Sequence, residues 1–323
     1  MSVTMICLVG EQPIPNLLPI LHYHPDAVVL VHSDFTERVA DRLQAVVTQE
    51  QPGISVRKCL VEPYSVDQIY RELERTVGSQ RGPELLVNLT GGTKPMMLAA
   101  FQLALARKTP SFYFKSEGLL NEVYFFQETS LPVPSTTPVA FDTTLTIKLH
   151  EAVFGQVRQA PKKNVGDKQE RFEAAVAHAL RSATPAVFDE IAVGAHFGQV
   201  EIDVIVRWRN QIVFCEVNHQ DLDKKAQKSL SNEKVFANLK QKLDQLSTAS
   251  GRDYFGTYIK KAVIFAGTED NMHPDYVELS KAQNVQTIPL PFRPSQDESK
   301  PLLTEDASIK LVERLSKILK PRV

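Results

Sequence analysis

The sequence has little of several things that define specialised classes of protein. Only three cysteines, Cys7, Cys59 and Cys215, occur among 323 residues, and they are widely spaced. A disulfide framework and a cysteine-rich zinc site both need more cysteines at closer spacing, so both are excluded. No run approaches the ~20 apolar residues of a membrane-spanning helix, and the first residues lack the basic segment of a secretory signal. We therefore expect a cytoplasmic protein that has no contact with a membrane.

An excess of one charge is also missing. The chain has 37 basic and 38 acidic side chains, a net charge of −1, so charge alone does not indicate a nucleic-acid partner. Its 14 glycines and 20 prolines are too few for a fibrous or low-complexity chain. At roughly 150 residues per domain, the length predicts two domains.

In the first 130 residues, short apolar runs alternate with amphipathic stretches. The runs that we expect to be strands cover residues 4–10, 27–33, 56–62, 84–90, 110–116 and 121–127. Strands separated by helices predict βαβ units and a mostly parallel sheet, closed here by a hairpin of the last two runs. We therefore predict an α/β fold with a first domain over residues 1–136. A proline-rich linker at 131–138 leads to a second, mixed α/β domain over residues 149–323.

The segment LTGGTKPMMLAA (89–100) has the first pattern that indicates chemistry. Gly91 and Gly92 follow an expected strand and permit a close approach of the backbone. The next helix turns its free N–H groups toward the same point, which favours an anion, and Thr90, Thr93 and Lys94 add further donors. It is not a Walker A loop. A tight connector is the plainer interpretation, but these residues together favour phosphate binding.

Two further stretches end at the same predicted edge, because the carboxyl ends of parallel strands meet there. Gly10 and Gln12 follow the first expected strand and could line this edge, although a turn and helix cap is the simpler role. Ser33 follows the second expected strand, where it is most simply a helix N-cap.

The segment QVEIDVIVRWRNQIVFCEVN (199–218) predicts a hairpin with two carboxylates on one face. A symmetric turn between Arg209 and Asn210 places Asp203 opposite Glu216. Two acids on an apolar face are costly to desolvate, and a bound Mg²⁺ or Mn²⁺ would remove that cost. Glu173 or Glu170 on the preceding helix could help. The alternative is a pair at a wet sheet edge, matched by lysine or arginine.

These stretches together resemble a known family. GEQPIPNLLPILHYHPDAVVLVHS (10–33) and NLTGGTKPMMLAA (88–100) resemble the CRISPR-associated Rossmann-fold (CARF) sensor domain of type III CRISPR ancillary effectors. Downstream, ERFE (170–173), EIDVIV (201–206) and VFCEVN (213–218) resemble the PD-(D/E)xK restriction-endonuclease core that is fused to such sensors. The resemblance covers most of the chain.

The resemblance implies that the Rossmann-like first domain forms a homodimer and binds a cyclic oligoadenylate, most simply cyclic tetra-adenylate, across the twofold axis. An anion-binding loop doubled by symmetry suits a ring of phosphates. The positions that match the sensor motifs are Gly10, Gln12, Pro13, Ser33, Asn88, Thr90, Gly91, Gly92, Thr93 and Lys94.

In the second domain, the resemblance assigns metal binding to Glu173, Asp203 and Glu216. A bound Mg²⁺ or Mn²⁺ would activate water and stabilise charge on the scissile phosphate. The family motif ends in E-x-K, whereas this chain has Asn218 two residues after Glu216, and asparagine carries no positive charge. Three lysines on the next expected helix are candidates to replace the missing one: Lys224, Lys225 and Lys228.

The sequence therefore leads to the hypothesis of a homodimeric, metal-dependent nuclease that cleaves DNA or RNA in type III CRISPR antiviral defence. Cyclic oligoadenylate would switch it on by binding the active state more tightly than the inactive one. Two alternatives stay open. Asn218 favours a sensor whose nuclease domain is inactive. Thr90, Thr93 and Lys94 would instead suit a ring nuclease that cuts its own cyclic ligand.

Overall fold

The structure, a computed structural model, shows a chain of two compact units, unit 1 (Met1–Gly155) and unit 2 (Gln156–Val323). It describes residues 2–117, 120–126, 139–156, 168–183, 187–197, 200–219, 232–249, 259–267, 274–292 and 303–319. No helix of these segments is long and apolar enough to cross a membrane.

Unit 1 contains a seven-stranded sheet with the strand order β3-β2-β1-β4-β5-β6-β7. The first five strands in this order, from β3 through β2, β1 and β4 to β5, pair in parallel, and β6 and β7 are antiparallel to their neighbours. This confirms the expected mostly parallel α/β sheet with a closing hairpin. The strands are β1 (Thr4–Leu8), β2 (Ala27–His32), β3 (Ser55–Leu60), β4 (Leu85–Asn88), β5 (Ser111–Glu117), β6 (Leu120–Phe126) and β7 (Val139–Phe141).

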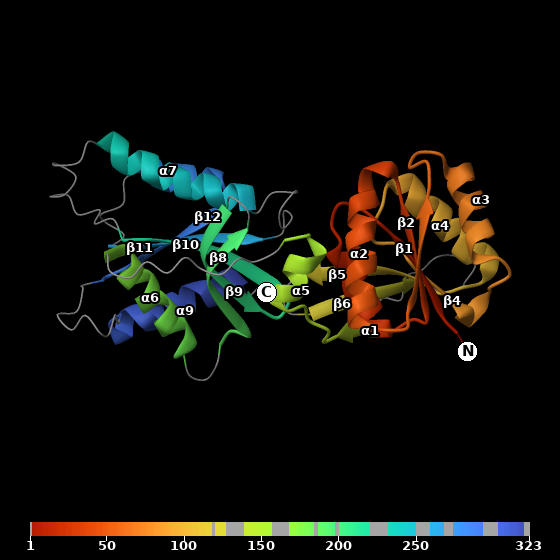
Figure 1. Cartoon of the computed structure of the whole chain (residues 1–323), viewed down its shortest axis with the longest axis horizontal. Coiled ribbons are helices and arrows are strands. Elements are labelled where there is room, and N and C mark those ends of the chain that lie inside the picture. Colours follow the sequence, from red (N-terminus) through yellow and green to blue (C-terminus); the bar gives the residue numbers. More distant parts are fainter. Residues whose placement is uncertain are drawn as a thin grey trace. The chain divides into compact units, whose positions relative to one another are not determined.

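Helices cover both faces of this sheet (Figure 1). All five residues of β1 are buried, as the apolar run TMICL predicts for a central strand of a parallel sheet. Its alternate residues Ile6 and Leu8 pack in a core cluster with α3 and α4, and α1 and α2 lie on the opposite face. The helices are α1 (Ile14–Tyr23), α2 (Glu37–Glu50), α3 (Val66–Val77), α4 (Lys94–Arg107) and α5 (Ile147–Val153), with short 3₁₀ turns η1 (Asp34–Thr36) and η2 (Gly82–Glu84).

Helix α5 belongs to unit 1, although the sequence places residue 149 at the start of the second domain. It packs against α2, and Arg42 of α2 donates a hydrogen bond from Nη1 to the carbonyl oxygen of Phe154 (3.0 Å). Unit 2 therefore begins later than expected, after Gly155. The expected linker, residues 131–138, lies outside the described residues.

Unit 2 contains a five-stranded mixed sheet with the order β12-β11-β10-β9-β8. Strands β8, β9 and β10 form an antiparallel meander, and β10, β11 and β12 pair in parallel. The strands are β8 (Glu190–Phe197), β9 (Val200–Trp208), β10 (Gln211–Asn218), β11 (Lys260–Ala266) and β12 (Val285–Leu290).

Helices also cover both faces of the second sheet. The alternate residues Val204, Val206, Val213 and Cys215 pack in a core cluster beneath two helices, α6 and α9. Helix α7 lies across the opposite face (Figure 1), so the central strands β9 and β10 are buried on both sides. The helices are α6 (Lys168–Arg181), α7 (Asn232–Ala249), α8 (Pro274–Ala282) and α9 (Glu305–Leu319).

Candidate functional site

The glycine loop of unit 1 lies at the switch point of its sheet. The chain leaves β1 toward β2 on one side, whereas β4 lies on the other side, so the loops after β1 and β4 face one another at the carboxyl edge. A Cβ atom on Gly91 would lie 1.9 Å from the carbonyl oxygen of Leu8, so only glycine fits there. Gly92 adopts a positive φ of 71°. Both glycines serve the close contact of these two loops.

A buried amide network holds the two loops together. Asn16, in the first turn of α1, donates from Nδ2 to the carbonyl oxygen of Leu8 (2.8 Å). Asn88, the last residue of β4, donates from Nδ2 to Oδ1 of Asn16 (3.1 Å) and to the carbonyl oxygen of Pro15 (2.9 Å). Both asparagine side chains are fully buried. Sequence reasoning placed Asn88 among the ligand contacts, and the structure places it beneath the loop.

The hydroxyl and backbone N–H groups of Thr90 also make hydrogen bonds within the protein. Its hydroxyl donates to Oδ1 of Asn88 (2.6 Å) and accepts from the backbone N–H of Phe114 (2.7 Å). Its own backbone N–H also donates to Oδ1 of Asn88 (3.0 Å). Thr90 therefore shapes the loop through internal hydrogen bonds.

Thr93 and Ser33 both take part in helix capping. The Thr93 hydroxyl accepts from the backbone N–H of Met96 (3.3 Å) at the start of α4 and donates to the carbonyl oxygen of Pro63 (2.6 Å). Ser33 is buried and caps the short turn η1, where its backbone N–H donates to Oγ1 of Thr36 (3.1 Å). The N-cap role predicted for Ser33 is confirmed.

The other predicted sensor residues lie along the same edge. Pro13 is buried and caps α1, whereas Gly10 and Gln12 are half-buried, and Gly10 lies against Gly91 and Gly92 of the loop. Lys94, the first residue of α4, is exposed at a helix N-terminus. The Lys94 side chain is therefore accessible to an anion, and the N-terminus of α4 favours negative charge at the same place.

A pocket of about 530 Å³ lies next to the glycine loop, beyond the ends of β2 and β3. Pro63 lines it, and the hydrogen bond between Thr93 and the Pro63 carbonyl joins the pocket wall to the loop. Arg71 and Gln68 supply donors from α3. Sequence reasoning missed these residues, because they follow a strand end that carries no glycine motif.

In unit 2, the β9–β10 hairpin has the predicted register. Gln211 pairs with Trp208 and Cys215 with Val204, so the turn is centred between Arg209 and Asn210 as expected. The paired residues end there, and Asp203 and Glu216 are the residues that come next in the two strands. Asp203 is 4% exposed and Glu216 is 0% exposed, so the acids are not at a wet sheet edge.

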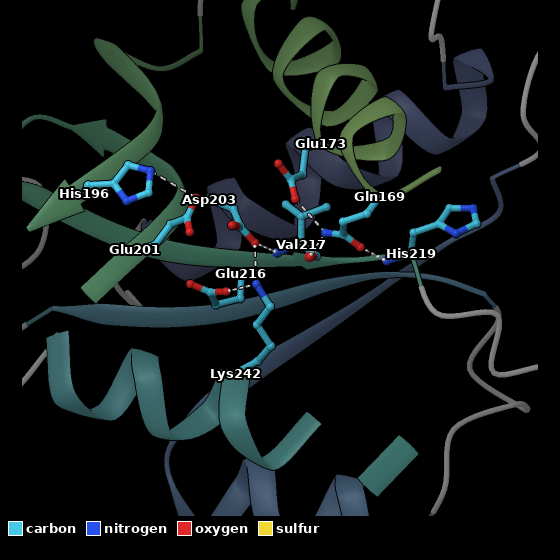
Figure 2. Close-up of polar contacts among 9 residues, drawn as sticks. All are labelled: Gln169, Glu173, His196, Glu201, Asp203, Glu216, Val217, His219 and Lys242. Atoms are coloured by element: carbon cyan, nitrogen blue, oxygen red, sulfur yellow. Dashed lines mark hydrogen bonds and ion pairs between the residues drawn. The ribbon is translucent and has the colours of Figure 1, made fainter. Parts of the chain in front are cut away.

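A lysine that sequence reasoning missed faces this pair (Figure 2). Lys242 of α7 places its Nζ 2.5 Å from Oε2 of Glu216 and 3.1 Å from Oδ2 of Asp203. The same Asp203 oxygen accepts a hydrogen bond from the backbone N–H of Val217 (2.7 Å). Oε1 of Glu216 has no hydrogen-bond partner within the part of the chain that the structure describes.

Glu173 reaches the same region from α6. Its Oε1 accepts from Nε2 of Gln169 (2.6 Å), and that nitrogen also donates to the carbonyl oxygen of Val217 (2.5 Å). Gln169 Oε1 in turn accepts from the backbone N–H of His219 (2.7 Å). Gln169 thus ties Glu173 to the end of β10 (Figure 2), and sequence reasoning had given it no role.

Burial and mutual repulsion perturb the acids. Burial, reinforced by the charge of Asp203, raises the pKa of Glu173 to about 7 and holds the pKa of Glu216 well above its usual range. Burial alone would lower the pKa of Lys242, but the charges of Asp203 and Glu216 outweigh it and raise that pKa. All three pKa values are thus raised, and perturbed pKa values that gather in one cluster are typical of functional sites.

Of the other residues considered, Asn218 is buried at the end of β10 and shares the face of Glu216, because alternate residues of a strand point the same way. Lys224, Lys225 and Lys228 lie outside the described residues.

The acid cluster fits a divalent cation in its donor chemistry. Asp203 and Glu216 offer hard oxygen atoms, and Oε1 of Glu216 is buried without a hydrogen-bond partner among the described residues. Within the described segments, however, no three carboxylate, histidine or cysteine side chains converge closely enough to hold a metal ion. Among the residues with described side chains, Lys242 supplies a positive charge to both acids.

Among known protein families, a match is found within unit 1. Residues 4–134 match the family described as the Card1 CARF domain. This segment contains the glycine loop, the amide network and the adjoining pocket. A search of curated protein sequences finds no match.

Solved structures show the same fold over the whole chain. Can2 from Sulfobacillus thermosulfidooxidans, solved in complex with cyclic tetra-adenylate, is 15% identical with a TM-score of 0.68, covering 98% of this chain and 97% of Can2. Protein VC1899 from Vibrio cholerae is 10% identical with a TM-score of 0.64, covering 98% of each chain. A type III CRISPR defence DNA nuclease activated by cyclic oligoadenylate is 16% identical with a TM-score of 0.58, and this chain spans 53% of its length. At these identities the likeness concerns the fold.

Proposed function

We propose that the protein is a metal-dependent nuclease of type III CRISPR defence that a cyclic oligoadenylate activates. The observation that carries the proposal is the buried pair Asp203 and Glu216, with Lys242 between them. Burying two acids side by side costs free energy, and such an unfavourable arrangement is typical of a site that binds a cation for catalysis. A CARF-matching unit in the same chain supplies the means of regulation.

The nuclease chemistry would centre on a Mg²⁺ or Mn²⁺ ion held by Asp203 and Glu216, with Glu173 nearby. When bound, such an ion activates water and stabilises the charge on phosphate. In the hydrolysis, the water oxygen bonds to phosphorus, the bond to the leaving ester oxygen breaks, and that oxygen takes a proton. Gln169 would orient Glu173 against the end of β10 throughout.

The ligand of unit 1 would be a cyclic oligoadenylate, and cyclic tetra-adenylate is the form bound in the Can2 structure. The glycine loop, Lys94 and the N-terminus of α4 would receive its phosphates. Gly10, Gln12 and Pro13 would line the same edge, while Asn88, Thr90 and Thr93 would hold the loop in shape through the hydrogen bonds described above.

A homodimer would complete that site. Helix α4 exposes Met97, Leu98 and Leu105 to between 37% and 49%. These apolar residues lie on the helix that begins at the glycine loop, so a second copy packed there would bring two loops together around one ring.

The decisive experiment measures cleavage with and without cyclic tetra-adenylate. We would incubate supercoiled plasmid, single-stranded DNA and single-stranded RNA with the full chain in Mg²⁺, Mn²⁺ or EDTA. We expect ligand-dependent cleavage that EDTA abolishes and that Glu216→Gln lowers at least about a hundredfold. Asp244→Asn, at an exposed carboxylate of α7, is the matched control and should cleave normally. Ligand binding without cleavage of any substrate would refute the nuclease function and favour a sensor with an inactive second unit.

The ring-nuclease alternative has less support from the site. A hydroxyl group that positions the ligand for self-cleavage needs free hydrogen-bonding capacity, but those of Thr90 and Thr93 are both engaged within the protein. Incubating the ligand with the protein in EDTA tests this directly, because a metal-free ring nuclease would release a linear product.

A further inference from the structure

The acid pair of unit 2 has a positive partner that comes from an unexpected place in the chain. The residue two positions after Glu216 is Asn218, which is uncharged. Lys242 instead reaches the pair from α7, with its Nζ 2.5 Å from Glu216 and 3.1 Å from Asp203 (Figure 2). Its side chain is 27% exposed, whereas those of Asp203 and Glu216 are 4% and 0% exposed, so Lys242 is the member of this cluster that has most contact with solvent.

Positions 218 and 242 approach the same carboxylates from different elements. Asn218 and Glu216 are alternate residues of β10 and therefore share a face of the sheet. Helix α7 covers that face, and its buried Leu243 and Leu246 hold it against the strands. A lysine at either position would place an ammonium group beside Glu216. The two positions are thus alternative sources of one charge.

We infer that Lys242 supplies the positive charge required for phosphodiester cleavage at the Asp203–Glu216 pair, in the place that a lysine at position 218 would otherwise take. The inference rests on the proposed function. It identifies Lys242 as the group that meets the negative charge developing on the phosphate when water attacks. Such charge stabilisation by a preorganised donor is among the largest contributions to catalysis.

Variants that remove Lys242 and place a lysine at position 218 of β10 test the inference. The variants are Lys242→Met, which keeps an apolar side chain of similar length without the charge, Asn218→Lys, and the double variant Lys242→Met/Asn218→Lys. Lys240→Met is the matched control, because Lys240 lies two residues away on the same helix and is exposed. Each full-length variant is assayed for cleavage with cyclic tetra-adenylate and Mn²⁺.

We expect Lys242→Met to lower the cleavage rate about a hundredfold or more, the loss typical of one charge-stabilising donor. The double variant should recover to within about tenfold of the parent protein, and Lys240→Met should be unchanged. A general structural role for Lys242 would not predict recovery through Asn218→Lys. Wild-type rates in Lys242→Met, faster cleavage in that variant, or no recovery in a folded double variant would each overturn the inference.

A second measurement does not depend on activity. In EDTA, Lys242→Met leaves the two acids without their cation, so we expect a lower melting temperature and a larger rise on adding Mn²⁺ than in the parent protein. The double variant should return both values toward those of the parent. Unchanged melting and an unchanged Mn²⁺ shift would overturn the inference even if no substrate were cleaved. Absence of cleavage by the parent protein would instead refute the proposed function.

Discussion

Replacing Gly91 by alanine is a direct test of the loop contact on which unit 1 depends. The new Cβ would lie 1.9 Å from the carbonyl oxygen of Leu8, where real Cβ atoms keep at least 3.0 Å, so backbone must move by about 1 Å. The oxygen that it meets is the acceptor for Asn16, and the Asn16 amide nitrogen itself lies 3.3 Å from the new atom. The clash therefore falls on the amide network that joins the two loops.

The cost follows from two effects. Overpacking a well-packed site costs about 1–3 kcal/mol, and a buried hydrogen bond that loses its partner costs about 1–3 kcal/mol more. Together they give a loss of about 4 kcal/mol in the free energy of unfolding of unit 1. At about 2–4 °C per kcal/mol for a unit of this size, the melting temperature should fall by about 10 °C.

Thermal unfolding of the full chain measures this loss, with Gly92→Ala as the matched comparison. At Gly92 the positive φ of 71° strains an alanine by about 1–2 kcal/mol, but the new Cβ would meet mainly side-chain atoms, the Met96 methyl among them, at 3.1 Å. We therefore expect Gly91→Ala to melt well below Gly92→Ala, and both to weaken binding of cyclic tetra-adenylate. A Gly91→Ala protein that melts within about 2 °C of the parent would refute the close approach of the loops.

Three further predictions concern single side chains. Because the pKa of Glu173 is raised to about 7, the folded state holds a proton that the unfolded state releases above about pH 4.5, so stability falls as pH rises between these values. In urea unfolding with EDTA, the free energy of unfolding of Glu173→Gln should therefore equal that of the parent at pH 5. At pH 8 it should be higher by about 1–2 kcal/mol, after allowance for the partial exposure of Glu173. An equal gain at both pH values would contradict this account. Asn88→Ala removes the four hydrogen bonds of the Asn88 side chain and should destabilise unit 1 by about 2–4 kcal/mol in the same assay, whereas a loss below about 1 kcal/mol would show that the network is dispensable. Lys94→Ala should lower the affinity for cyclic tetra-adenylate about tenfold by calorimetry without changing stability, and the exposed Lys148→Ala should change neither, since only Lys94 stands at the anion-binding helix end.

The parts of the fold that are local in sequence could be predicted. The hairpin register follows from the symmetric turn at Arg209 and Asn210, because a two-residue loop fixes every later pair up to Cys215 and Val204, which Asp203 and Glu216 directly adjoin. The parallel sheet follows in the same way from apolar runs separated by helices. Helix α5 was assigned to the wrong unit, because its apolar face does not specify which sheet it packs against.

The sensor residues show what a motif leaves open. The sequence places hydroxyl and amide groups on the glycine loop, but it does not show where their hydrogen bonds go. That depends on Asn16, which lies 72 residues before Asn88 and meets it only because β1 and β4 are neighbours. Residues that match a binding motif are in this case partly the support of the loop, and Lys94 is left to face an anion.

Lys242 was missed for a related reason. Its helix carries an apolar stripe of Leu239, Leu243 and Leu246, and Lys240 and Lys242 flank this stripe on opposite sides. Helical periodicity shows that one face meets the sheet, but which flank meets the acids depends on the direction in which α7 crosses β9 and β10. The structure turns Lys242 inward and leaves Lys240 exposed. The asparagine at position 218 departs from the sequence motif, but this alone does not indicate lost activity. A helix from elsewhere in the chain can bring a lysine to the same carboxylates, and only the three-dimensional structure shows which helix does so.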